Sequence, residues 1–208
     1  MARSKRRYLL LAIVYFKMIL IGEGVLMREL SLHILDIAQN SIAADADLVR
    51  ITIEENIDQD LLIITIADNG RGMDKKQQEK VVDPFVTSRE TREVGLGIPF
   101  LKKAAQNCEG ELKIDSTPGK GTEITANFEY SHIDRAPLGN ISGTITTLIT
   151  TNPTINFIYC HYIDNNKFEV RTKDIKNELE NVAINNPQVV EWIEGYIKEN
   201  LEELKSNR

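Results

Sequence analysis

An apolar stretch that runs into a turn-like segment constrains the fold of this chain more than any other feature. Residues 61–67, LLIITIA, are almost continuously apolar, which predicts a strand near the centre of a sheet. The next six residues, DNGRGM, contain Asn-Gly, a common hairpin turn. A hairpin needs a second alternating strand at once, yet the polar KKQQEK follows and favours a short helix. DNGRGM is therefore not a simple hairpin turn, and Asp68 becomes a candidate ligand residue.

The order of the predicted elements indicates the fold class. A helix over residues 28–44 precedes two strands, LVRITIEE and LLIITIA, and a short helix over 74–82 comes next. After a loop punctuated by proline and glycine, the helix IPFLKKAAQNC leads into two more strands, ELKIDST and GTEITANFEY. This order predicts an α+β fold, a two-layer sandwich in which helices cover one face of a mixed sheet.

A change of composition at SHIDRAPLGN, residues 131–140, suggests a boundary between a unit at 27–131 and a small C-terminal α/β segment at 138–208. The C-terminal segment is predicted to contain a threonine-rich helix, a hairpin and two further helices. The last helix has an apolar stripe, which more often packs into a core than it binds a partner. The stripe consists of Trp192, Ile193, Tyr196, Ile197, Leu201 and Leu204. No motif assigns a role to this segment, so partner recognition is only a default hypothesis.

Composition excludes several classes of protein. The 208 residues are 42% hydrophobic and 27% charged, which suits a globular protein of one or two domains. Cys108 and Cys160 lack the spacing of a zinc site or a disulfide framework and fit a reducing compartment, so we expect a cytoplasmic protein. A net charge of −6 argues against a general nucleic-acid binder.

The first 26 residues differ from the rest of the chain. They contain five Lys or Arg and a long apolar run, which resembles a signal peptide but lacks a small-residue cleavage site. Lys17 interrupts the run, which makes a membrane span improbable. Because Met27 begins a coherent amphipathic helix, a start assigned too far upstream is the leading explanation. A packed extension and a weak membrane anchor are the alternatives.

Two segments contain residues that could carry chemistry. Asp36 and Asn40 lie four residues apart on the first predicted helix and so share one face. A carboxylate can accept a proton there, and an amide oxygen can bind Mg²⁺. Gly95, Leu96 and Gly97 open a helix, where backbone N–H groups favour an anion. Neither GLGIPF nor GKGT completes a standard phosphate-binding motif. A solvated polar stripe and an ordinary glycine loop remain open for the two segments taken singly.

Taken together, the motifs resemble the Bergerat-fold ATP-binding domain shared by DNA gyrase B, Hsp90, histidine kinases and MutL-type proteins. DIAQNSIAADAD is similar to the asparagine helix of that family, DNGRGM to its DxGxG(M) box and DPFVTS to its aromatic box. GLGI and GKGT resemble the two later glycine motifs. The resemblance covers roughly residues 28–130.

The resemblance implies ATP and Mg²⁺ as ligands and assigns a role to each matching residue. Asp68 would accept a hydrogen bond from the adenine amino group, Asn40 would hold Mg²⁺, and Thr122 would lie beside Asp68. The other implied nucleotide-binding residues are glycines that let the backbone approach the base or phosphates, the methionine of the box, and residues that border a lid. These are Gly70, Gly72, Met73, Ser88, Arg89, Gly95, Leu96 and Gly97.

The reaction is less constrained than the ligand. By the resemblance, Asp36 occupies the place of a glutamate base, which favours hydrolysis or phosphorylation of a hydroxyl, although aspartate is one methylene shorter. The lid segment of Arg89 to Val94 is short, as in kinase-type members. His33 is predicted to pack or to support the site, and His132 is a weak candidate for a phosphate acceptor. His161 lies in a predicted strand and is expected to be a packed or solvent-facing histidine.

Three functions remain open at this stage. The first is a phosphotransferase, a protein kinase that acts on a separate partner protein. The second is an ATPase used as a conformational switch, and the third is a nucleotide-binding regulatory module without turnover. A membrane or nucleic-acid partner is not expected, and a homodimer is one of the assemblies left open.

Overall fold

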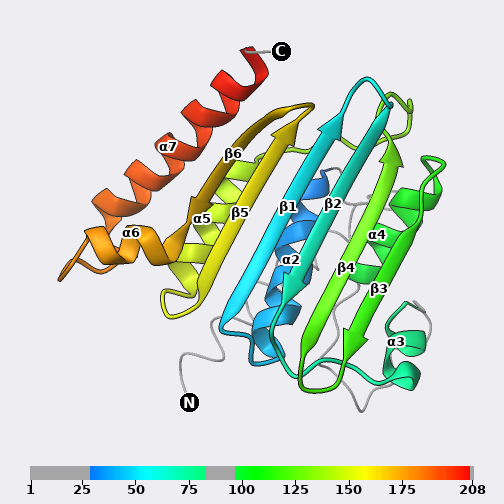
Figure 1. Cartoon of the computed structure of the whole chain (residues 1–208), viewed down its shortest axis with the longest axis horizontal. Coiled ribbons are helices and arrows are strands. Elements are labelled where there is room, and N and C mark those ends of the chain that lie inside the picture. The colour runs from blue at the N-terminus through cyan, green and yellow to red at the C-terminus, as the bar shows by residue number, and fades with distance from the viewer. Residues whose placement is uncertain (1–28, 83–96, 207–208) are drawn as a thin grey trace, which may run out of the picture.

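The chain forms a six-stranded sheet with a layer of helices against one face (Figure 1). The structure is a computed structural model that describes residues 29–82 and 97–206. The strands are β1 (Leu48–Asn56), β2 (Leu61–Asp68), β3 (Leu112–Thr117), β4 (Gly121–Glu129), β5 (Asn156–Ile163) and β6 (Asn166–Arg171). The helices are α2 (Leu30–Ala43), α3 (Lys75–Val81), α4 (Gly97–Gln106), α5 (Ile141–Thr151), α6 (Thr172–Glu178) and α7 (Pro187–Ser206).

The sheet is mixed. Its strands lie in the order β3-β4-β2-β1-β5-β6, and every neighbouring pair is antiparallel except β1 and β5, which are parallel. β2 is an interior strand, as its apolar sequence predicts. The α+β prediction with a mixed sheet is therefore confirmed.

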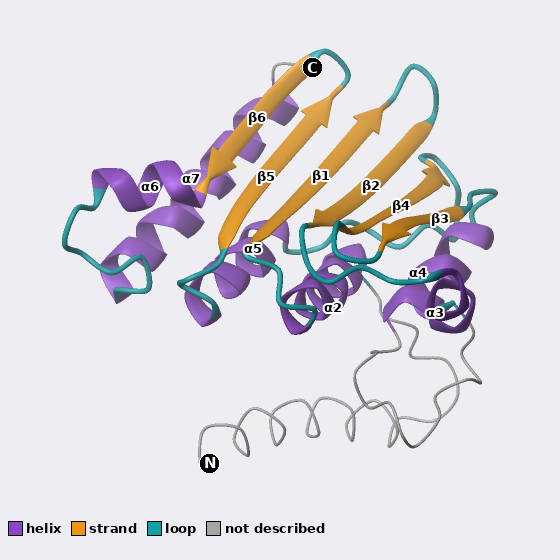
Figure 2. Ribbon diagram, turned by 60° about the horizontal axis from the view of Figure 1, so that its bottom comes forward, coloured by secondary structure: helices purple, strands orange, loops and turns teal. Residues whose placement is uncertain are grey.

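Alternation along the strands decides which face of the sheet the helices cover. Val49, Ile51 and Ile53 are buried, whereas Arg50 between them is exposed, so β1 presents one apolar face. α2, α4 and α5 lie on that face (Figure 2). α2 occupies the middle of this layer and packs against α4 on one side and α5 on the other. The helix that carries Asp36 and Asn40 is thus held between α4, α5 and the sheet.

The C-terminal segment extends the same sheet. β5 pairs with β1 along its whole length, from Leu48 opposite Asn156 to Glu55 opposite Ile163. The connecting stretch from Ser131 to Asn140 also contacts α2, because the N–H groups of Leu30 and Ser31 donate to the carbonyls of residues 137 and 138 at 2.9 Å. The predicted boundary lies in this connection, and the residues on its two sides share one sheet and one helix layer.

The last helix is buried along a narrower stripe than its sequence suggests. α7 lies along β6 at the edge of the sheet and packs against α5 (Figure 1). Ile193, Ile197 and Leu204 are buried, whereas Trp192 is 54% exposed and stacks on Tyr196 at a ring distance of 5.2 Å. The aromatic residues of the predicted stripe therefore lie at its rim.

None of the helices within residues 29–82 and 97–206 has the length and apolar character needed to cross a membrane. The predicted extension at residues 1–26 lies outside the described residues.

Candidate nucleotide-binding site

The predicted site residues gather where β2 and α2 end at the same edge of the fold. β2 ends at Asp68, which lies opposite Thr122 in the β2–β4 ladder. The DNGRGM loop then turns over the C-terminal end of α2, where the Arg71 N–H donates to the Ala44 carbonyl at 2.9 Å. The Arg71 side chain donates to the carbonyl of Ala43 at 3.0 Å. The loop is thus attached to the helix that carries Asp36 and Asn40.

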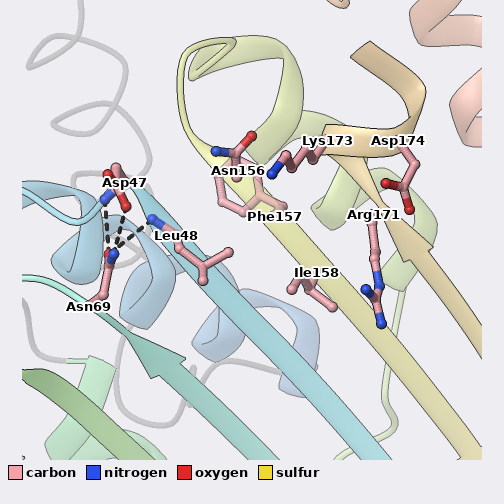
Figure 3. A pocket seen from close by; sticks show the side chains of 9 residues that line it. All are labelled: Asp47, Leu48, Asn69, Asn156, Phe157, Ile158, Arg171, Lys173 and Asp174. Carbon is pink, nitrogen blue, oxygen red and sulfur yellow. Dashed lines mark hydrogen bonds between the residues drawn. The ribbon is translucent and has the colours of Figure 1, made fainter. Parts of the chain in front are cut away.

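Asn69 supports the loop by bonding to the beginning of β1. Its Oδ1 accepts the N–H groups of Asp47 and Leu48 at 3.1 and 3.0 Å, and its Nδ2 donates to Asp47 Oδ1 at 2.6 Å (Figure 3). These bonds join the end of β2 to the beginning of β1. The Asn of this Asn-Gly pair therefore has a structural role that its turn-like sequence does not reveal.

The two glycines of the loop are required by close packing. A Cβ at position 70 would lie 2.6 Å from the Ala44 carbonyl oxygen. Gly72 has a φ of +65°, and a Cβ there would lie 2.0 Å from the carbonyl oxygen of Thr117. Both positions bring the backbone of the loop against neighbouring backbone, which fixes its path beside Asp68.

Asp68 belongs to a small polar network. Its Oδ1 accepts the N–H of Gly70 at 2.8 Å, while its Oδ2 makes no hydrogen bond to any residue of the described ranges. Nearby, the hydroxyl of Ser116 lies 2.8 Å from the Thr122 hydroxyl and accepts the Met73 N–H at 2.8 Å. Asp68, Ser116 and Thr122 line one shallow cavity of about 230 Å³. One carboxylate oxygen is thus left to accept a hydrogen bond from a ligand.

Sequence reasoning missed Ser116. It lies opposite Thr122 in the β3–β4 ladder, so the two side chains point to the same face. Pairing ELKIDST with GTEITANFEY across the PGKG turn could have identified it, because that register places Ser116 beside a predicted site residue.

Asp36 lies against the first residue of α4. A Cβ at Gly97 would lie 2.1 Å from Asp36 Oδ2, so the glycine allows the two helices to approach at the carboxylate. Burial raises the pKa of Asp36 above its ordinary value, and the backbone of Gly97 partly offsets this effect. A carboxyl with a raised pKa is better suited to accept a proton near neutral pH.

Asn40 provides the second polar group on this face of α2. Its Nδ2 is buried and has no hydrogen-bond partner within the described residues. An amide oxygen is a hard donor of the kind that Mg²⁺ binds, and the Asp36 carboxylate one helical turn away is left to accept a proton. The described residues contain no group of three or more His, Cys, Asp or Glu that could hold a metal by themselves. The amide oxygen of Asn40 fits a Mg²⁺ whose other ligands are phosphate oxygens and water.

Four predicted residues cannot be located. Ser88, Arg89, Gly95 and Leu96 lie outside the described residues, as does the DPFVTS segment. The described site residues therefore form two groups. Asp36 and Asn40 of α2 lie with Gly97 where α2 meets α4, and Thr122 lies with the DNGRGM loop at the end of β2.

A larger cavity of about 400 Å³ is lined in part by Asp47 and Asn69 (Figure 3). It is bordered by the beginnings of β1 and β5 and by residues of β6 and α6, including Arg171, Lys173 and Asp174. It contains neither Asp68 nor Asn40. The motif residues, and not cavity size, therefore locate the candidate site.

A comparison with known families decides what this arrangement is. Residues 26–132 match the family described as histidine kinase-, DNA gyrase B- and HSP90-like ATPase, which covers just over half of the chain. The chain belongs to this family. The resemblance predicted from the five sequence motifs is thereby confirmed, and residues 26–132 form the histidine kinase-like ATPase region, which is related to sensor kinases.

Relatives of the ATPase-family region include long sensor proteins. The sensor histidine kinase WalK of Bacillus subtilis (strain 168) is 39% identical over 87 residues, which are 39% of this chain and 14% of WalK. Sporulation kinase E of the same organism is 32% identical over 97 residues, 46% of this chain and 13% of the kinase. A putative sensor protein of Shewanella frigidimarina is 28% identical over 114 residues, 54% of this chain and 17% of that protein. The chain thus spans less than a fifth of the length of these relatives.

Two solved structures align with parts of this chain. The N-terminal domain of a DNA repair protein aligns with a TM-score of 0.49 and 16% identity over 71% of this chain and 53% of that one. Full-length ShkA in complex with AMPPNP aligns with a TM-score of 0.39 and 20% identity over 47% of this chain and 20% of ShkA.

Proposed function

We propose that this chain binds ATP with Mg²⁺ and transfers the terminal phosphate to a partner protein. The observation that carries this proposal is the free Oδ2 of Asp68, held at a strand end by the glycine loop that is bonded to α2. A fixed carboxylate oxygen of this kind can recognise an amino group such as that of adenine. Because the loop is attached to the helix of Asp36 and Asn40, a base bound at Asp68 would have its phosphates directed along that helix.

The remaining residues divide between phosphate binding and chemistry. Asn40 would hold Mg²⁺, which when bound neutralises phosphate charge and aligns the phosphates. Gly97 would offer a backbone N–H to a phosphate oxygen at the beginning of α4. Asp36 would accept the proton of the attacking group, and its contact with Gly97 keeps it beside the phosphate end. We expect this activity in the cytoplasm, where ATP is available.

A separate partner is the more plausible phosphate acceptor than this chain. His33 and His161 are 0% and 1% exposed, so neither can reach a transferred phosphate. His132 is partly exposed, and its Nδ1 accepts the N–H of Asp134 at 3.1 Å. Several relatives are named as sensor or sporulation kinases, which supports phosphate transfer. Kinase activity toward a partner is therefore the function that we favour.

Hydrolysis of ATP is the second candidate, and Asp36 is the observation that favours it. A carboxylate beside the phosphates can activate water as readily as a hydroxyl group. The two candidates differ in the destination of the phosphate. Incubation with radiolabelled ATP and a co-purified partner should label the partner in the first case and release inorganic phosphate in the second.

Replacement Asp36→Asn is expected to lower the rate of phosphate transfer or release by about 10²–10⁴-fold, because the amide cannot accept the proton. Nucleotide affinity should stay within about twofold, since Asp68 and the loop are unchanged. Asp174→Asn, which removes an exposed carboxylate in the first turn of α6, serves as the control and should retain full activity. Turnover of Asp36→Asn equal to that of the wild type would show that Asp36 is not the base.

A further inference from the structure

The site face of α2 contains a third polar residue, and this residue has no partner. His33 lies three residues before Asp36 and seven before Asn40, so the three side chains share one face of the helix. His33 is 0% exposed, and neither of its ring nitrogens has a hydrogen-bond partner within the described residues. A neutral imidazole always presents one donor and one acceptor. Burying both without partners destabilises the folded state.

Few groups lie where they could satisfy this ring. The backbone of Gly97 lies beside both side chains and acts on both, raising the pKa of His33 and lowering that of Asp36. Of the helices beside α2, α5 has no charged residue and the lysines of α4, at 102 and 103, lie beyond its first turn. β1 and β2 present Ile, Leu and Val beneath α2, and the buried Glu55 pairs with His161. Among the described residues of these elements, Asp36 is therefore the ionisable side chain that shares the site face of α2 with His33.

The protonation state of His33 suits donation to a carboxylate. Burial lowers the pKa of His33 to about 4, so the ring is neutral at physiological pH and keeps one N–H. Residues three apart on a helix have Cβ atoms about 5–6 Å apart, a distance that an imidazole and a carboxylate span directly or through one buried water.

We propose that His33 is a positioning residue that donates its ring N–H to the Asp36 carboxylate, directly or through one water, and holds it toward the phosphates. This inference rests on the proposed function, in which Asp36 is the base. An aspartate reaches less far than the glutamate that the family resemblance leads one to expect, so a fixed orientation matters more for it. A side chain retained at a cost in stability is characteristic of functional sites.

The test compares His33→Leu, which fills a similar volume without nitrogens, with His33→Gln, which keeps an N–H donor. In the full chain, His33→Leu should raise the unfolding temperature by about 2–4 °C, because an unpartnered polar group is removed. The Kd for ATP with Mg²⁺ should stay within twofold. Turnover should fall at least about tenfold, with the acid limb of its pH profile moved to higher pH. His33→Gln should recover part of the turnover, and His132→Leu should behave as wild type.

A second measurement does not depend on turnover. Titration of the Asp36 carboxyl by carbon-13 NMR should show a higher pKa in His33→Leu than in the wild type, because a donor to the carboxylate is lost. An unchanged Asp36 pKa in His33→Leu, or in His33→Ala if the leucine variant does not fold, overturns the proposal and makes His33 a packing residue. If the wild type binds ATP without turnover, the proposed phosphotransfer fails, and the carboxyl titration still decides the role of His33.

Discussion

A chain that ends at residue 137 is expected to lose cooperative folding, even though residues 26–132 match the ATPase family by themselves. The deletion removes β5, which pairs with β1 from Leu48 to Glu55, and leaves the N–H and C=O groups of β1 that point toward β5 without partners. It also removes α5, whose buried side chains Ile141, Ile145 and Leu148 pack into the core shared with α2. A typical domain is stable by only about 5–15 kcal/mol, so these losses exceed the margin.

Chemical unfolding followed by far-ultraviolet circular dichroism tests this expectation. The truncated chain should show no cooperative transition, whereas a control chain that ends at Lys205 should unfold as the full chain does, because it lacks only the end of α7. A truncated chain with a cooperative transition and the ATP affinity of the full chain would show that the C-terminal segment is dispensable for the fold.

The replacement His161→Leu is expected to destabilise the protein by about 3–5 kcal/mol, because it leaves a buried carboxylate without its partner. Glu55 Oε1 lies 2.7 Å from His161 Nε2, and the Tyr159 hydroxyl lies 2.6 Å from His161 Nδ1. All three residues are at most 6% exposed. Glu55 belongs to β1 and His161 to β5, so this network joins the strands of the ATPase region and the C-terminal segment.

A double variant is the matched control. Glu55→Leu combined with His161→Leu replaces both polar side chains by apolar groups of adequate size and should recover most of the lost stability. Denaturant midpoints of the wild type, the single variant and the double variant measure both effects. Equal midpoints for the wild type and His161→Leu would contradict an energetic role for this network.

The same network should make stability depend on pH. Burial by itself would raise the pKa of Glu55, but hydrogen bonds from His161 and Tyr130 and the nearby charges of His161 and Lys205 outweigh it and lower that pKa below 4.5. A carboxyl whose pKa falls on folding contributes stability above the unfolded value, and this contribution is lost as pH drops through the folded value. The wild type should therefore lose more stability than the double variant below about pH 4.5.

Local patterns in the sequence predict most of the elements and miss most of the long-range pairing. The alternation in LVRITIEE and the apolar run in LLIITIA identify β1 and β2 because each pattern is complete within one strand. The parallel pairing of β1 with β5 joins residues about 110 positions apart and has no local signature. The C-terminal segment therefore reads as a separate unit in the sequence, whereas in the structure it shares the sheet.

The site residues likewise divide into those that local sequence patterns predict and those that depend on long-range contacts. Motif order is sufficient to group Asp36, Asn40 and Asp68, because each lies in a segment with a recognisable pattern. The contact of Gly97 with the Asp36 carboxylate and the isolation of the His33 ring depend on how α2 meets α4, which no single segment encodes. The structural role of Asn69 is likewise invisible in the sequence, since its bonds reach back to the beginning of β1.

Calorimetric titration of the full chain with a non-hydrolysable ATP analogue and Mg²⁺ tests the central claim most directly. The wild type should bind, and Asp68→Asn should bind about 10–150-fold more weakly, which corresponds to a loss of about 1.5–3 kcal/mol for one charged hydrogen bond. The asparagine can still accept the Gly70 N–H, so the loop should keep its shape. Asp58→Asn, at the other end of β2, should bind as the wild type does. A folded wild type that does not bind, or equal affinity in Asp68→Asn, would contradict a nucleotide site at Asp68.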